Sequence, residues 1–79
     1  MRIKTTEQLG RTIRTRRKQL RITQPELAMS CGTGLRFIVD LEKGKPTCQI
    51  GKALGVLQSL GLAIEIGPPV REAPGGSKP

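Results

Sequence analysis

The stretch TQPELAMSCGTGLRFIVDLEKGK, residues 23–45, contains two short helical patterns separated by a turn that contains glycine. The hydroxyl of Thr23 can cap the first pattern, and Glu26 three residues later completes a reciprocal capping box. Pro25 lies near the first turn, where its missing N–H would have been unpaired anyway. Gly32 stands where a left-handed residue is needed between closely packed helices. The stretch therefore predicts two helices joined by a tight turn.

The second pattern predicts a helix over residues 33–43, which Gly44 ends. Phe37, Ile38 and Leu41 recur at the spacing of a buried stripe. The remaining positions are less committed to the core: Gly34, Leu35, Arg36, Val39 and Asp40. Arg36 is the one basic residue of this outward set.

The N-terminal flank predicts a basic amphipathic helix over residues 6–21, with Thr5 or Thr6 as its N-cap. Its apolar stripe is expected at Leu9, Ile13 and Leu20. Basic side chains spread over the rest of its surface: Arg11, Arg14, Lys18 and Arg21. Binding to a membrane surface is disfavoured, because the face opposite the basic side chains has no Trp or Phe to anchor it.

The C-terminal flank predicts a fourth helix over about residues 47–60, with Thr47 as its cap and Gly61 as its stop. Its apolar ridge is expected at Ile50, Leu54 and Leu57. Three glycines lie inside helical patterns, where close helix packing is the expected reason: Gly10, Gly51 and Gly55.

Residues 62–66, LAIEI, alternate in the period of a half-buried strand. No partner strand exists in this chain, so we expect the strand to pair with its copy in a second subunit across a two-fold axis. An extended tail that packs on the fourth helix is the alternative. Residues 67–79 are rich in Pro and Gly, which predicts a flexible tail. Residues 1–61 then form the helical domain.

Composition favours a nucleic-acid partner. The 79 residues form one small domain, near the size where a second subunit often completes the fold. Lys and Arg number 14 against 6 Asp and Glu, a net charge of +8, and residues 1–22 carry eight of the basic groups and one acidic group. Such a basic block favours a polyanionic partner, because its cations can neutralise phosphate charges. Phe37 is the single aromatic residue, too few for base stacking, so duplex DNA is the favoured polyanion.

Several function classes are disfavoured. The chain has no His to activate a nucleophile, so we expect no enzymatic activity. Asp40 and Glu42 point in different directions on their helix and do not form an acid–base pair. Cys31 and Cys48 are too few for a disulfide framework or a usual zinc site, and are expected to be reduced packing residues. No transmembrane or signal segment is visible, so the cytoplasm is the expected compartment.

The segments RKQLRITQPELA, residues 17–28, and CGTGLRFIVDLEKGK, residues 31–45, resemble the helix-turn-helix of Xre/Cro/C1-type transcriptional regulators. The four-helix order extends the resemblance to about residue 60. It implies an all-α, lambda-repressor-like domain in which the second helix crosses the phosphate backbone of DNA and the third lies in the major groove.

The resemblance also implies roles for individual residues. The expected base contacts are Gly34, Leu35, Arg36, Val39 and Asp40, with Arg36 donating a bidentate pair to guanine. The expected phosphate contacts are Gln24, Thr33, Lys43 and Lys45. Ordinary capping is the alternative for Thr33, and simple solvation is the alternative for the two lysines. Arg17 is expected to pair with Glu42 as a structural brace.

Residues 53–66, ALGVLQSLGLAIEI, resemble more narrowly the HipB-type antitoxins. This likeness implies a homodimer that binds a palindromic operator, represses its own operon and neutralises a HipA-like Ser/Thr kinase toxin, with no cofactor and no metal. The dimerising residues would be Leu62, Ile64 and Ile66. Two alternatives remain: a stand-alone Xre-type regulator without a toxin, and a protein-interaction adaptor that uses the helix-turn-helix only as a scaffold.

Overall fold

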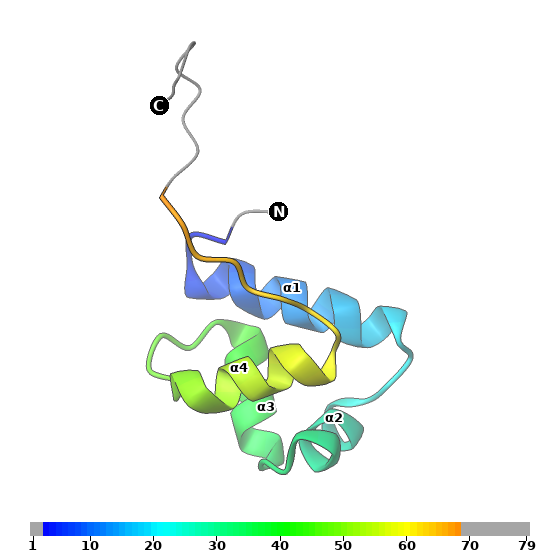
Figure 1. Cartoon of the computed structure of the whole chain (residues 1–79). Helices are drawn as coiled ribbons and strands as arrows, with labels where there is room; N and C mark the ends of the chain where they lie inside the picture. The colour runs from blue at the N-terminus through cyan, green and yellow to red at the C-terminus, as the bar shows by residue number, and fades with distance from the viewer. Residues whose placement is uncertain (1–2, 69–79) are drawn as a thin grey trace.

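The computed structural model describes residues 3–68, which contain four helices and no strand. The helices are α1 (Thr6–Gln19), α2 (Gln24–Cys31), α3 (Leu35–Lys43) and α4 (Ile50–Ser59). In Figure 1, α1 lies along one side of the domain, α2 lies on the opposite side, and α3 runs between them. α3 packs against both α1 and α2, and α4 packs against α2. The predicted all-α, four-helix architecture is confirmed.

Helix α1 begins where the sequence predicts and ends two residues early. The Oγ1 atom of its N-cap, Thr5, accepts from the Gln8 N–H at 3.0 Å, and Oε1 of Gln8 accepts from the Lys4 N–H at 2.6 Å. The helix stops at Gln19 because Arg21 adopts a φ of 60°, a left-handed conformation that turns the chain toward α2.

The helix before the α2–α3 turn, α2, matches the prediction closely. The capping box is present: Thr23 Oγ1 accepts from the Glu26 N–H at 3.2 Å, and Glu26 Oε1 accepts from the Thr23 N–H at 2.7 Å. Gly32 then ends α2 with a φ of 68°. Helix α3 starts two residues later than expected, because Gly34 rather than Thr33 occupies the N-cap position.

Helix α4 differs from its prediction in both start and orientation. Thr47 lies in a turn and does not cap the helix, which begins at Ile50 after Gln49 without a side-chain cap. The predicted ridge is wrong at two of its three positions, because Ile50 is 72% exposed and Leu54 is 44% exposed. The observed buried face is Ala53, Val56, Leu57 and Leu60. Both sets have helical spacing, so the period alone could not choose between them.

The hydrophobic core is shared by all four helices. Its buried residues are Ile13, Leu27, Ala28, Ile38, Leu41, Ala53, Val56, Leu57 and Leu60. Leu9 and Phe37 pack against this core while partly exposed, whereas Leu20 of the predicted α1 stripe is 41% exposed. Cys31 and Cys48 are unpaired thiols that also pack against it, as the sequence predicts.

The three helical glycines have different environments. A Cβ on Gly10 would lie 2.6 Å from the backbone oxygens of Leu41 and Glu42, so α1 and α3 approach too closely there for any side chain. The prediction of close packing is confirmed at this position. It is wrong for the described residues at Gly51 and Gly55, where an added Cβ would meet no atom within 4 Å.

The predicted C-terminal strand falls on a segment that leaves α4 in an extended direction (Figure 1). Leu62 is half-buried against the core, whereas Ile64 is 49% exposed and Ile66 is 95% exposed. Residues 62–66 make no strand pairing within the described chain, and their pairing across a dimer stays a prediction. Most of the predicted tail, residues 69–79, lies outside the described residues. Every helix within residues 3–68 is too short or too polar to cross a bilayer.

Candidate nucleic-acid interface

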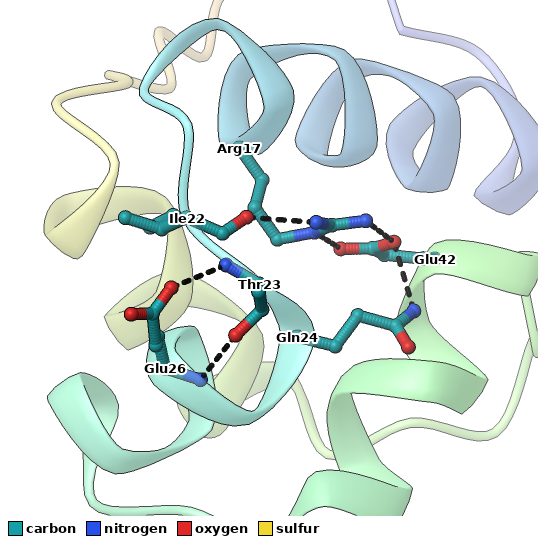
Figure 2. Close-up of polar contacts among 6 residues, drawn as sticks. All are labelled: Arg17, Ile22, Thr23, Gln24, Glu26 and Glu42. Carbon is teal, nitrogen blue, oxygen red and sulfur yellow. Dashed lines mark hydrogen bonds and ion pairs between the residues drawn. The ribbon is translucent and has the colours of Figure 1, made fainter.

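A buried ion pair fixes α1 against α3. Nε of Arg17 donates to Glu42 Oε2 at 2.6 Å and Nη2 donates to Oε1 at 3.1 Å, a bidentate geometry (Figure 2). The third contact of this guanidinium runs from Nη1 to the carbonyl of Ile22 at 2.9 Å. Both charged residues are 8% exposed. The brace that the resemblance implies is therefore present, and it sets the position of α3.

Gln24 joins the same network from the first residue of α2. Its Nε2 donates to Glu42 Oε1 at 3.1 Å, so the side chain predicted to contact a phosphate is turned toward the brace (Figure 2). An amide NH₂ has two donor hydrogens, and one of them remains for a second acceptor. The brace therefore orients the start of α2 as well as α3.

The first turn of α3 is open to solvent. Leu35 is 46% exposed, and the side chain of Arg36 is 87% exposed. A Cβ added to Gly34 would meet no atom within 4 Å, so this position leaves room for a close-approaching surface. Val39 is half-buried one turn further along. The predicted base-reading positions thus share the outer side of α3, with Arg36 projecting furthest.

Asp40 belongs to this set of positions but is engaged by two cations. Its Oδ1 lies 3.4 Å from Arg36 Nε and its Oδ2 lies 3.5 Å from Lys45 Nζ, with the Asp40 side chain 20% exposed. The carboxylate is therefore placed to orient Arg36 rather than stand alone against a base. Sequence reasoning missed this pair, although the i, i+4 spacing of Arg36 and Asp40 is the signal that predicts it.

Three of the four predicted phosphate contacts lie at the ends of α3. Lys43 is exposed in the last turn, and the Lys45 side chain is 53% exposed just beyond it. Thr33 does not cap α3, since Gly34 is the N-cap. Its Oγ1 is buried and has no hydrogen-bond partner among the described residues. A phosphate contact from Thr33 therefore needs a rotation of this hydroxyl toward solvent.

Two further contacts have no signal in the sequence. Nε of Arg16 donates to the carbonyl of Leu60 at 2.8 Å, which holds the end of α4 to α1. Nζ of Lys52 lies 5.8 Å from the centroid of the Phe37 ring, a cation over an aromatic face beside α3. Both pairs are distant in sequence, so no spacing predicts them. Within residues 3–68, no three His, Cys, Asp or Glu side chains gather as a potential metal site.

The predicted dimerising residues adjoin an exposed face of α4. A groove of about 480 Å³ is lined by Gly51, Leu54, Gly55, Leu57, Gln58, Leu62, Ala63 and Ile64. Leu54 was expected in the core, yet here it shares an open apolar groove with Leu62 and Ile64. Ile50, at the start of the same helix, is also exposed. The structure thus brings the predicted strand beside apolar side chains that the single chain does not cover.

Comparison with known proteins agrees with this geometry. The HTH-type transcriptional regulator y4mF of Sinorhizobium fredii is 58% identical over 65 residues, which are 82% of this chain and 86% of that protein. Chains of the "Structure of HipA-HipB-O2-O3 complex" and the "HipB-O4 20mer complex" each match with a TM-score of 0.79 at 26% identity, covering 86% of this chain and 96% of theirs. No protein-family model matches the chain. On the identity to y4mF and the HipB-like arrangement of its four helices, the chain belongs to the Xre/Cro-type helix-turn-helix transcriptional regulators.

Proposed function

We propose that the protein is a sequence-specific DNA-binding repressor that binds a palindromic operator as a homodimer. The observation that carries this proposal is the exposed first turn of α3, in which the Arg36 side chain is 87% exposed, on a helix fixed by the buried pair of Arg17 and Glu42. A side chain that reads bases must project from a helix whose position is set before binding, because misplacement by about 1 Å forfeits the hydrogen bonds.

Base reading rests mainly on Arg36. Its guanidinium can donate two parallel hydrogen bonds to O6 and N7 of guanine in the major groove. Leu35 beside it can contact a thymine methyl group, Gly34 allows close approach, and Val39 supplies a further apolar contact. Asp40 holds Arg36 by its Nε, which leaves the two terminal nitrogens for the base.

Phosphate contacts would fix the register of the domain on the duplex. Gln24 has a donor hydrogen beyond its bond to the brace, and it is the first residue of α2, where the positive end of the helix dipole favours a phosphate. Lys43 and Lys45 follow α3, and Thr33 precedes it. Contacts at these positions carry no base information and act equally on any sequence.

Dimerisation is supported by the uncovered side of α4. The exposed apolar side chains Leu54 and Ile64 line one groove, and Ile66 is almost fully exposed. A second copy that pairs at residues 62–66 would cover this groove and satisfy the backbone groups of the extended segment. Two recognition helices would then reach half-sites about 34 Å apart, one turn of the duplex.

We further propose that this regulator is the antitoxin of a HipBA-like operon, which it represses while neutralising a HipA-like Ser/Thr kinase toxin. The support is the likeness to HipB in a complex that also contains HipA. The second candidate is a stand-alone regulator, and its support is the 58% identity to y4mF, which is named an HTH-type transcriptional regulator. In both cases the protein acts by binding rather than catalysis, and in the cytoplasm, where its DNA would lie. Copurification with the product of an adjacent kinase-like gene distinguishes the two.

Gel shifts with an operator selected from random duplexes, and with a scrambled duplex, test the DNA-binding proposal. Arg36→Ala should weaken operator binding by about 1–3 kcal/mol and leave binding to the scrambled duplex almost unchanged. Lys43→Ala is the matched control, which should weaken both equally because it removes a phosphate contact. Equal losses for Arg36→Ala would make Arg36 a phosphate contact. Duplex binding that is absent or insensitive to salt would favour the adaptor alternative.

A further inference from the structure

The basic side chains of α1 fall into two groups. Arg16 donates to the carbonyl of Leu60 and Arg17 pairs with Glu42, so both serve the fold. Arg11, Arg14 and Lys18 are exposed and make no side-chain hydrogen bond or ion pair with any residue between positions 3 and 68. We call these three residues the α1 basic stripe. These three basic residues take no part in the hydrophobic core or in the base-reading surface of α3.

The α1 basic stripe lies on the exposed flank of α1 next to its α3 contact. At about 100° per residue, its three members fall within an arc of about 60°. Arg17 and Gly10, which both contact α3, are the next positions around the helix on one side of this arc. Arg16, which reaches the end of α4, lies roughly opposite. The stripe therefore flanks the α3 contact of α1, and its member Arg11 also borders a surface hollow that Arg16 and Leu62 line.

Arg21 extends the stripe, and its backbone adopts an unfavourable conformation. Its N–H donates to the Lys18 carbonyl at 3.0 Å, which places it just beyond the stripe and two residues before Thr23, the N-cap of α2. Its φ of 60° is a conformation that glycine adopts readily and that L side chains seldom adopt. An exposed arginine at a glycine-type position indicates that the side chain itself is used.

We propose that the α1 basic stripe and Arg21 form a track that binds the phosphate backbone of duplex DNA beside the half-site read by α3. The stripe residues are three or four apart and rise about 4.5–6 Å from one to the next, a spacing that long side chains can match to successive phosphates. One end of this track adjoins the start of α2, and the other adjoins the last turn of α3. Both of these elements already belong to the proposed DNA surface. The inference thus rests on the proposed function.

The chemistry of the track fits phosphate better than an acidic protein. Protein interfaces usually contain an apolar centre with a polar rim. The uncovered apolar side chains Ile50, Leu54 and Ile64 belong to α4 and the segment after it, and none of them is part of the track. Three unpaired cations that share their face with one acidic residue, Glu7, and have no apolar centre suit a charged, hydrated backbone.

The test measures affinity for operator and scrambled duplexes over a range of salt concentrations. The triple variant Arg11→Gln, Arg14→Gln, Lys18→Gln should bind both duplexes about tenfold or more weakly, and its slope of log affinity against log salt should fall by up to about 2.7, about 0.9 for each contact. The control Gln49→Glu, Lys52→Gln, Ser59→Glu changes the net charge by the same amount at exposed positions in and beside α4, and its slope should stay at the wild-type value.

Arg21→Gly gives a second test, because this variant should fold as well as the wild type and weaker DNA binding would then not be due to unfolding. Glycine fits the left-handed turn, so the thermal midpoint should be unchanged or raised. The slope should still fall by about 0.9, with the preference for operator over scrambled duplex retained. Wild-type slopes in both track variants would overturn the track and leave an acidic protein as the occupant. A wild-type protein that binds neither duplex would overturn the proposed function together with the track.

Discussion

The side of the domain where α1 meets α3 and the side formed by α4 and residues 62–66 are built in opposite ways. On the first side, Gly10 allows backbone contact, and the buried charges of Arg17 and Glu42 are satisfied within the chain. On the second side, Gly55 faces empty space and Leu54 lines an open groove. The contrast indicates that a single chain completes the support of the recognition helix, whereas the α4 side is left for another surface.

The largest expected effect comes from breaking the brace. Glu42→Ala leaves the buried Arg17 guanidinium without its carboxylate and removes an acceptor from Gln24, which should cost about 3–5 kcal/mol of folding free energy. A domain of this size has little more stability than that. Urea titration followed by circular dichroism should therefore show a largely unfolded protein.

The control for this prediction replaces both partners. The double variant Arg17→Met, Glu42→Leu leaves no unpaired charge in the core and should recover most of the lost stability. If Glu42→Ala cost less than about 1 kcal/mol, the pair would behave as an exposed ion pair and the first side would not be the rigid one.

Gly10→Ala tests the close approach of the two helices. The added methyl would lie 2.6 Å from two backbone oxygens, neither of which can move without shifting α3, so we expect a loss of about 1–3 kcal/mol despite the better helix propensity of alanine. Because the shift moves α3, operator binding should fall more than binding to a scrambled duplex. A protein as stable as the wild type would show that the helices can separate at no cost.

The sequence predicts the first side better than the second for a physical reason. The capping box at Thr23 and Glu26 is a local signal, and the partners Arg17 and Glu42 came from the family pattern. The orientation of α4 depends on contacts between distant residues, such as Arg16 with the Leu60 carbonyl, which no periodicity encodes. Leu57 belongs to both the predicted and the observed ridge, so the error was a rotation of the helix about its axis.

The candidate site shows the same division between local and distant information. Its positions follow from the helix-turn-helix pattern, and the structure exposes Arg36 as expected. The roles of its neighbours depend on side-chain partners. Asp40 is held between Arg36 and Lys45, and the alternative role of Thr33 as a cap is lost because α3 begins after Gly34. A spacing predicts which residues share a face, whereas their partners depend on the exact start of the helix.

The smallest expected effect, Gly55→Ala, separates the two sides most sharply. A methyl here meets no atom of the described chain within 4 Å, so it should raise the stability of α4 by about 0.5–1 kcal/mol, opposite in sign to Gly10→Ala. If a second copy covers the groove beside Leu54, the same methyl occupies space that the partner needs. Chemical unfolding at low concentration should then show a more stable chain, while sedimentation equilibrium shows a weaker dimer. Gains in both stability and association would mean that the dimer forms elsewhere and leaves the α4 side for a different protein.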